Sequence, residues 1–244
     1  SQGFQLPAQN TVSDTTAPLI SLKGVNFSYR AAGRRVDALR DITLDVERGE
    51  FVSICGPSGC GKSTLLNIMG TLDRPETGSV VFHGQNVANA APGALARLRA
   101  FDIGFVFQNF NLIDSLSVYE NIKLALLYRH KPDFHIDERV QEVMDLVGIA
   151  HRANHLPNQL SGGQQQRCAI ARAIVGKPSM ILADEPTGNL DSENAAQIFS
   201  ILKAVNAEGC TLVIVTHAPA QADQAERIVE MLDGKIQFTR RRLS

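Results

Sequence analysis

The sequence predicts an α/β fold in which a mostly parallel sheet carries helices on both faces. Three observations predict it. Short, almost wholly apolar runs recur, as in strands buried on both faces, at residues 51–55, 103–107, 180–183 and 212–215. Segments with helical patterning lie between them, at residues 64–70, 136–147, 164–175 and 193–206. Residues 109–163 have helical patterning without a buried strand, which predicts a helical lobe inserted into the sheet domain.

Composition and charge exclude several classes of protein. The chain has 244 residues, enough for one large domain or one domain with an inserted lobe. Its 24 Lys and Arg residues nearly balance 25 Asp and Glu residues, so no global field attracts nucleic acid or an anionic membrane. With 44% hydrophobic and 20% charged residues, the whole chain is not expected to be disordered. No stretch approaches the roughly 18 apolar residues of a membrane-spanning helix.

The beginning of the chain and its cysteines predict a reduced, cytosolic protein. Residues 1–20 lack the basic start and apolar run of a secretory signal, and a start at Ser1 suggests a trimmed end. The cysteines contain no CxxC pair, which argues against a disulfide framework or a zinc site; they are Cys55, Cys60, Cys168 and Cys210.

Two segments are expected to form the sheet-containing core, residues 19–107 and 176–236. The first segment begins with two stretches of strand-like pattern, one on either side of a turn at Gly33. Residues 108–175 are expected to form the helical subdomain. Its clearest helix ends at Gly148 and presents one apolar face, made by Val140, Val143, Met144 and Val147.

Both ends of the chain are polar. Residues 1–18 are expected to form a loose tail, with a partner-binding arm as the alternative. Residues 237–244 are expected to form a solvated basic tail. The alternative is that its arginines, Arg240 to Arg242, touch phosphates or anionic lipid.

A glycine-rich loop follows the apolar run at residues 51–55 directly and precedes a predicted helix. It fits G-x-x-x-x-G-K-S and comprises Gly56, Pro57, Ser58, Gly59, Cys60, Gly61, Lys62 and Ser63, with Thr64 next. Glycines let backbone N–H groups converge on phosphate oxygens, and the helix N-terminus adds a favourable dipole. The Lys62 ammonium suits the β- and γ-phosphates, and the Ser63 hydroxyl suits Mg²⁺. The alternative is an ordinary glycine-rich turn.

Two adjacent carboxylates, Asp184 and Glu185, end the apolar run that begins at residue 180. Ligands of open α/β sheets sit beyond the carboxyl ends of the strands, so both side chains are expected to face a nucleotide crevice. Asp184 is suited to hold Mg²⁺ through its water shell. Glu185 is the candidate general base that activates the attacking water. The alternative is a solvated strand end.

A second anion-binding helix start is predicted at Ser161, Gly162, Gly163 and Gln164. Ser161 and Gln164 fit a capping box, and the glycines allow a ligand to approach the backbone. A capped helix without a ligand is the alternative. The chain then has two anion-binding features, the phosphate loop and this capped helix. We therefore expect a two-fold dimer in which each nucleotide contacts the loop of one copy and the capped helix of the other.

The combination of LSGGQQQR (160–167), LADEP (182–186) and GPSGCGKS (56–63) resembles the ABC-type ATPases over residues 20–236. The resemblance implies a P-loop (RecA-like) core, an antiparallel β subdomain and an inserted α-helical subdomain, with ATP and Mg²⁺ as cofactors. It also implies an aromatic that stacks on adenine at Tyr29, where a strand-face aromatic is the alternative.

The resemblance assigns roles to three further residues. Gln108 matches a glutamine that reaches Mg²⁺ and the attacking water and links the helical lobe to the core. Asp191 matches a loop that meets the partner copy. His217 matches a histidine that contacts the γ-phosphate, with a structural histidine as the alternative.

The chain departs from the family pattern at two positions. The family often has Asp after the histidine, where this chain has Ala218, so a salt bridge from that position is absent. Cys60 occupies a variable place in the phosphate loop. An exposed thiolate beside Lys62 is open to oxidation, and a tolerated small residue is the preferred interpretation.

Within the family, GTLDRPETGSV (70–80), FQNFNLIDSLSVYENI (107–122) and ADEPTGNLDS (183–192) resemble the group of macrolide-efflux, lipoprotein-releasing and FtsE-type ATPases (MacB, LolD, FtsE). Antimicrobial-peptide resistance transporters carry similar strings. The resemblance implies an ATPase that drives a membrane partner with a large extracytoplasmic region.

We therefore expect an ATP-hydrolysing subunit at the cytoplasmic face of the inner membrane. Its expected partners are a second copy of itself and a transmembrane permease subunit, without nucleic acid. The sequence leaves the cargo, the direction of transport and the choice of ATP over GTP open. A soluble ABC ATPase acting on DNA or ribosomes is the alternative. A P-loop GTPase is disfavoured because no N-K-x-D element is present.

Overall fold

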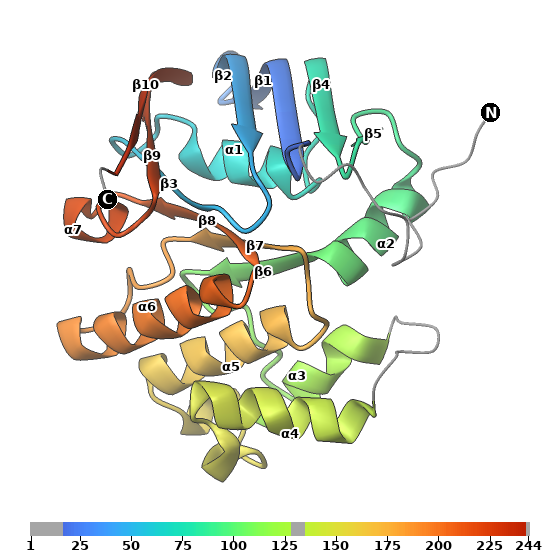
Figure 1. Cartoon of the computed structure of the whole chain (residues 1–244), viewed down its shortest axis with the longest axis vertical. Helices are drawn as coiled ribbons and strands as arrows, with labels where there is room; N and C mark the ends of the chain where they lie inside the picture. Colours follow the sequence, from blue (N-terminus) through green and yellow to red (C-terminus); the bar gives the residue numbers. More distant parts are fainter. Residues whose placement is uncertain (1–16, 128–134, 243–244) are drawn as a thin grey trace. The chain divides into compact units, whose positions relative to one another are not determined.

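The computed structural model describes residues 17–127 and 135–242. These residues form two compact units. The first unit contains the described residues up to Arg99 and those from Val213 onward, and the second contains Ala100–Leu212. Strands β6 (Ile103–Phe107) and β7 (Met180–Asp184) and helix α6 (Ser192–Ala207) thus group with the helical elements, whereas the sequence led us to expect them in the core (Figure 1). The predicted N-terminal tail lies, up to residue 16, outside the described residues.

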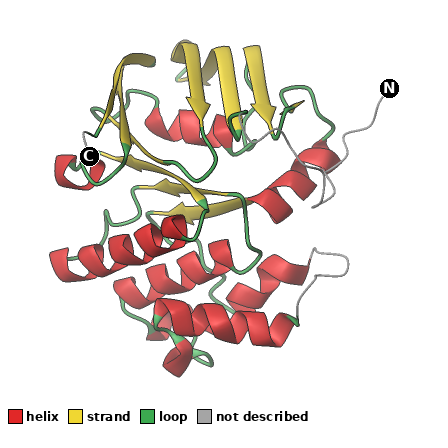
Figure 2. Cartoon of the chain, in the orientation of Figure 1, coloured by secondary structure: helices red, strands yellow, loops and turns green. Residues whose placement is uncertain are grey.

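The first unit contains an antiparallel sheet with strand order β2-β1-β4-β5, labelled in Figure 1 and drawn in yellow with the other strands in Figure 2. Its strands are β1 (Ile20–Ala31), β2 (Arg34–Val46), β4 (Thr77–Phe82) and β5 (Gln85–Asn86). The turn expected at Gly33 joins β1 to β2, and both Ala32 (φ 48°) and Gly33 (φ 77°) are left-handed, as a tight hairpin requires. The implied antiparallel β subdomain is confirmed.

A second set of strands in the first unit has the order β10-β9-β3, formed by β3 (Phe51–Cys55), β9 (Arg227–Leu232) and β10 (Lys235–Arg241). β3 and β9 are parallel, with Val52 opposite Arg227. The unit also contains α1 (Lys62–Met69) and α7 (Pro219–Ala222). The expected run 51–55 is therefore a strand with the predicted bounds, and four of its five residues are buried.

The C-terminal segment corrects one expectation. A basic tail from residue 237 is wrong for residues 237–241, which belong to β10 and pair antiparallel with β9. Asp233 (φ 49°) and Gly234 (φ 75°) form the turn between them, and an Asp-Gly pair is a strong hairpin signal. Arg240 pairs with Asp223 at 2.8 Å. Residues 243–244 lie outside the described residues.

The second unit contains two parallel strands and a group of helices. β6 (Ile103–Phe107) lies beside β7 (Met180–Asp184), with Phe107 opposite Asp184. The helices α3, α4 and α5 contact one another, and α5 also contacts β6 and α6. Their bounds are α3 (Val118–Leu127), α4 (Ile136–Val147), α5 (Gly162–Ile174) and α6 (Ser192–Ala207), with short 3₁₀ turns at Ala150–Arg152 and Pro157–Gln159.

Helix α4 has the predicted bounds and the predicted buried face of Val140, Val143, Met144 and Val147. It ends at Gly148, whose left-handed φ of 73° is typical of a helix C-terminus. Two elements cross the division between the units: α2 (Pro92–Asp102), which the sequence did not predict, and β8 (Thr211–Thr216).

Candidate functional site

The glycine-rich loop between β3 and α1 packs its backbone against neighbouring strands of the first unit. A Cβ atom at Gly56 would lie 2.2 Å from the carbonyl oxygen of Met231. A Cβ atom at Gly61 (φ 100°) would lie 2.4 Å from the carbonyl oxygen of Ala38. Because no side chain fits at either position, the glycines are required by the close approach of backbone to backbone.

The Lys62 side chain lies inside this loop. The residue is only 7% exposed, and its ammonium donates to the carbonyl oxygens of Gly56 at 2.7 Å and Pro57 at 2.9 Å. The loop carbonyls therefore hold a positive charge at the start of α1, where the helix N-terminus also favours an anion.

A cavity of about 430 Å³ opens beside the loop within the first unit. Its size suits a small organic ligand, since such sites span about 300–1,000 Å³. Tyr29, 47% exposed, lines the same cavity as Lys62 and Ser63. The other lining residues are Val36, Asp37, Ala38, Arg40, Gly59, Gly61, Thr64, Asp233 and Gly234. The structure thus brings the predicted aromatic and the predicted phosphate loop together.

The remaining loop residues differ in exposure. Pro57, Ser58 and Gly59 are exposed, whereas Cys60 is only 3% exposed. The Cys60 sulfur lies 3.9 Å from the Lys62 nitrogen. The interpretation of Cys60 as an exposed thiolate is therefore wrong, and its burial favours the interpretation as a tolerated small residue.

At the carboxyl ends of β6 and β7, in the second unit, Gln108 and Glu185 each follow one of two paired residues, Phe107 and Asp184. Glu185 is left-handed (φ 46°), and its carbonyl oxygen accepts from the Gly188 N–H at 3.0 Å in a tight turn. A left-handed residue with a side chain is strained, and such strain clusters at functional sites. The predicted acids and the predicted glutamine therefore share one edge.

Asn189, to which we assigned no role from the sequence, connects this edge to the following turn. Its side-chain nitrogen donates to the backbone oxygen of Gln108 at 3.0 Å. Its side-chain oxygen accepts from the Gln108 side-chain nitrogen at 3.1 Å. Gly188 makes room for this contact, because a Cβ atom there would lie 2.5 Å from the same Gln108 nitrogen.

The predicted capping box at the start of α5 is present. The Ser161 hydroxyl accepts from the Gln164 N–H at 3.2 Å, and the Gln164 side chain accepts from the Ser161 N–H at 3.0 Å. A Cβ atom at Gly163 would lie 2.3 Å from the side-chain oxygen of Asn194, so α5 begins directly against the first turn of α6.

Asp191 caps helix α6. Its carboxylate accepts from the Asn194 N–H at 2.9 Å. This backbone hydrogen bond lowers the pKa of Asp191 from its usual range, because it stabilises the ionised form. The residue is exposed. The structure places Asp191 beside the start of α5 through Asn194, which bonds to Asp191 and packs against Gly163.

His217 follows the last residue of β8, in the first unit, and is exposed. The Thr216 hydroxyl beside it accepts from the Ala218 N–H at 3.0 Å. Ala218 is the N-cap residue of α7 and supplies no side-chain cap, which is the structural consequence of the missing Asp.

Among the described residues, no group of three or more His, Cys, Asp or Glu side chains is arranged to hold a metal ion. Mg²⁺ at nucleotide sites is instead bound by one or two carboxylates with phosphates and waters. The Asp184 carboxylate supplies such oxygens, as does the Gln108 amide, whose nitrogen is already engaged by Asn189. These hard oxygen donors of the second unit fit Mg²⁺, as does, by itself, the exposed Ser63 hydroxyl of the first unit.

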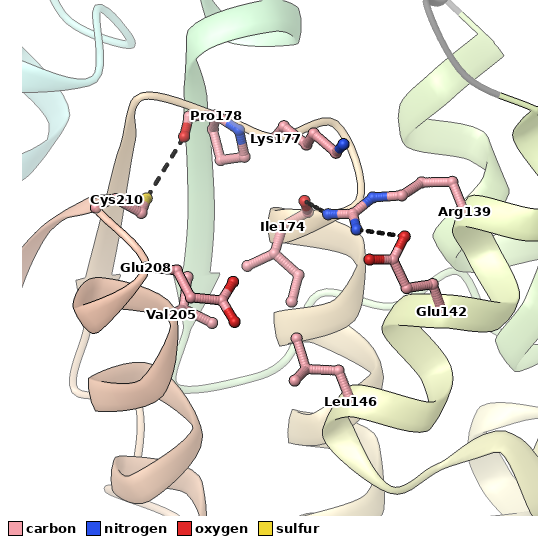
Figure 3. A pocket seen from close by; sticks show the side chains of 10 residues that line it. Arg139, Glu142, Leu146, Ile174, Lys177, Pro178, Val205, Glu208 and Cys210 are labelled. Carbon is pink, nitrogen blue, oxygen red and sulfur yellow. Dashed lines mark hydrogen bonds and ion pairs between the residues drawn. The ribbon is translucent and has the colours of Figure 1, made fainter.

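A second cavity, of about 650 Å³, lies within the second unit and contains no predicted site residue (Figure 3). Arg139 lies at its edge and donates to the carbonyl oxygens of Ile174 at 3.1 Å and Val175 at 3.0 Å. It also pairs with Glu142 at 2.8 Å, which lowers the pKa of that carboxyl group. Arg139 therefore stabilises the C-terminus of α5, as a cation does at the negative end of a helix.

Throughout the described part of the chain, we find no helix that combines the length and the apolar character needed to cross a membrane.

The sequence was compared with family models and with known proteins, and both comparisons give matches. The family model described as ABC transporter matches residues 39–188. The chain is 46% identical over 230 residues to the macrolide export ATP-binding/permease protein MacB 1/2 of Paracoccus denitrificans, covering 94% of this chain and 34% of that protein. It is 46% identical over 218 residues to the uncharacterized ABC transporter ATP-binding protein YknY of Bacillus subtilis, covering 89% and 95%. The chain thus spans about a third of the MacB relative.

Solved structures give the same result. The dimeric structure of MJ0796, a bacterial ABC transporter cassette, matches with a TM-score of 0.85 and 43% identity, covering 91% of this chain and 98% of that one. A dimeric post-hydrolysis state of MJ0796 bound to ADP and Pi matches with a TM-score of 0.85 and 41% identity, with the same two coverages. The predicted α/β fold is confirmed.

Proposed function

The chain belongs to the ABC transporter family as an ATP-hydrolysing cassette, and we propose that it dimerises on ATP and drives a transmembrane partner. One observation carries the proposal: a single chain presents a phosphate loop with a lysine inside it and, separately, a capped helix start without a lysine. The dimeric cassettes of MJ0796 support the pairing of these two features across two copies.

In this proposal the first unit binds the nucleotide. The backbone N–H groups of residues 58–64 surround the phosphates, because the close-packed glycines fix the curvature of the loop. Lys62 exchanges its carbonyl partners for the β- and γ-phosphates. Tyr29 stacks on the adenine, which its place in the same cavity supports.

The second unit supplies the groups that act on water. Glu185 is the general base, and Gln108 orients the attacking water from the neighbouring strand end. Asp184, Gln108 and Ser63 would hold Mg²⁺, which when bound neutralises charge that develops on the phosphate oxygens. His217 contacts the γ-phosphate.

The capped helix start completes the nucleotide site of the other copy. The helix start at Ser161, Gly162, Gly163 and Gln164 meets the γ-phosphate held by the partner's loop. The capping box engages the N–H groups of Ser161 and Gln164, so the donors to the phosphate are the N–H groups of Gly162 and Gly163. Asp191 lies in the segment that meets the partner copy. Each nucleotide then contacts two chains. Because hydrolysis cleaves off the γ-phosphate that joins them, it releases the dimer.

The transport partner is proposed from the relatives. The MacB relative is named as both ATP-binding protein and permease, and this chain matches about a third of it. We therefore place the chain at the cytoplasmic face of the inner membrane, in contact with a permease of the MacB and LolD type. The names of both curated relatives favour this interpretation over a soluble ATPase acting on DNA or ribosomes.

The test is Glu185→Gln in the purified chain. Steady-state hydrolysis should fall about 100-fold or more, because the general base is lost. ATP binding should be retained, and light scattering should show an ATP-dependent dimer. Glu138→Gln, the same change at an exposed position of α4, is the control. Full hydrolysis by Glu185→Gln would remove Glu185 from the base role, and hydrolysis by a chain that stays monomeric would contradict the shared site.

The membrane partner needs a separate experiment. The chain should co-purify with an integral membrane protein from detergent-solubilised membranes, and the partner should stimulate hydrolysis. Stimulation by DNA or ribosomes, without an integral protein, would favour the soluble alternative.

A further inference from the structure

Helix α5 carries a glutamine on its buried face. Gln166 is 0% exposed and belongs to the face that also contains Gly163, Ile170 and Ile174. Its side-chain nitrogen donates to the carbonyl oxygen of Phe107 at 3.1 Å and to that of Pro186. One amide therefore uses both of its N–H donors on the backbone of two other elements.

The two carbonyl groups flank the residues proposed to act on water. Phe107 immediately precedes Gln108, and Pro186 immediately follows Glu185. β6 and β7 end at the paired residues Phe107 and Asp184, so the backbone beyond this pair lacks further ladder partners from the two strands. Beyond the paired residues, the Gln166 amide supplies hydrogen bonds to this backbone. Through its bond to the Pro186 carbonyl oxygen it holds the turn in which Glu185 is left-handed.

Packing alone does not explain a glutamine at this position. The Gln166 side-chain oxygen is buried and has no hydrogen-bond partner in the described part of the chain. A buried acceptor without a partner destabilises the fold relative to an apolar side chain of the same shape. The buried amide is therefore present at a cost in stability, which points to a role for its two donors.

A second side chain of α5 acts on the same segment. Arg172 donates to the carbonyl oxygens of Phe110 at 3.0 Å and Asn111 at 2.6 Å. These residues follow Gln108 by two and three positions, and both are left-handed, with φ of 62° and 51°. Gln166 and Arg172 of α5 together bond to the backbone on either side of Gln108 and just after Glu185, where several residues are left-handed.

We propose that Gln166 is a positioning residue for ATP hydrolysis, which fixes the peptide units beside Gln108 and Glu185 through the two donors of its buried amide. The proposal rests on the proposed function, because it requires these two residues to act on the attacking water. Gln166 itself touches neither nucleotide nor water.

The first test is Gln166→Leu, which keeps a similar volume and removes both donors. Turnover at saturating ATP should fall about tenfold or more, the effect expected from two lost buried hydrogen bonds. ATP affinity should stay unchanged, since the phosphate loop lies in the other compact unit. Gln141→Leu is the control, because Gln141 is an exposed glutamine of α4 whose side-chain nitrogen donates to Asp145 of the same helix at 3.1 Å.

The second test is Gln166→Glu. Its ionised carboxylate offers only acceptors to two carbonyl oxygens, whereas its protonated form donates one hydrogen bond. Burial favours the protonated form, and protonation increases as the pH falls. The turnover of Gln166→Glu, divided by that of the wild type, should therefore rise from alkaline to mildly acidic pH. The same ratio for Gln166→Leu should stay flat, and a purely structural role would not produce this difference.

The outcomes separate the two proposals. A wild-type chain without ATP hydrolysis contradicts the proposed function itself. Hydrolysis by the wild type with unchanged turnover in Gln166→Leu overturns only the positioning role. Loss of ATP binding in parallel with turnover, or failure of both variants to fold, also overturns it, because Gln166 would then be a structural residue.

Discussion

In the first unit the phosphate loop packs its backbone against backbone carbonyl groups of β2 and β9, whereas in the second unit the segments after β6 and β7 are held by side-chain amides. Gly56 and Gly61 approach backbone carbonyl groups too closely for any Cβ atom. By contrast, Gln108 and Glu185 are held through Asn189 and Gln166, whose side chains bond across elements.

This difference separates two kinds of functional residue. The residues of the phosphate loop are contiguous in sequence, and a substitution among them should affect nucleotide binding directly. The segments that contain Gln108 and Glu185 are held by the amide side chains of Asn189 and Gln166. Substitutions of these amides should lower turnover while ATP binding is retained. The predictions below test this separation.

The largest effect on binding is expected from Lys62→Ala. The charged hydrogen bonds of the ammonium to the phosphates are lost, which should weaken ATP binding about 10- to 100-fold. Calorimetric titration with a non-hydrolysable ATP analogue measures the change. Lys23→Ala, an exposed lysine of β1, should bind as the wild type does. Unchanged affinity in Lys62→Ala would contradict the assignment of the loop.

The same substitution at two glycines contrasts the two regions. Gly61→Ala places a Cβ atom 2.4 Å from the backbone oxygen of Ala38, with φ of 100°, so nothing nearby yields easily. It should destabilise the chain by more than about 1 kcal/mol and impair ATP binding. Gly188→Ala places a Cβ atom 2.5 Å from the side-chain nitrogen of Gln108, so the Gln108 side chain must move away from its contact with Asn189. Its binding should stay normal and its turnover should fall.

Thermal unfolding measures the stability of both glycine variants, and nucleotide titration measures their ATP affinity. Equal loss of ATP binding in the two variants would mean that the regions are not held by different means.

The same distinction explains what the sequence could predict. Residues 51–55 and 136–147 were predicted with their observed bounds, because buried runs and an apolar face are local patterns. The loop from Gly56 to Ser63 was recognisable because its members are contiguous. The β9–β10 hairpin was missed although Asp233-Gly234 signalled it.

Other contacts were not predictable from local pattern. Asn189 and Gln108 are 81 positions apart, and Gln166 bonds to a carbonyl group 59 positions away. The only hint was that Gln166 falls on the apolar face of its helix. A polar residue on such a face identifies a position to examine and does not name its partner.

A smaller effect is expected from Asn189→Ala. Turnover should fall about 3- to 10-fold, the value of one net hydrogen bond, because the Gln108 side chain is no longer held. ATP affinity should not change. Asn189→Asp keeps the acceptor for the Gln108 side chain and loses the donor to its backbone, so its turnover should be intermediate. Combined with Gln108→Ala, the effect of Asn189→Ala should largely disappear, and simple additivity would show that the contact is not functional.

The smallest effect is expected at Asp191, the exposed cap of α6. Its pKa is lowered in the folded chain, so the stability it contributes is fully present above its ordinary value of 3.8. That contribution is lost as the pH falls from 3.8 through the lower folded value. Asp191→Ala should therefore lower the melting temperature by a few degrees at neutral pH, with a difference that shrinks in acid. Asp191→Asn, which keeps an oxygen acceptor at the cap, should lose less. A difference between Asp191→Ala and wild type that stayed constant through acid pH would assign the stabilisation to packing, and the cap of α6 would then resemble the backbone-held loop of the first unit.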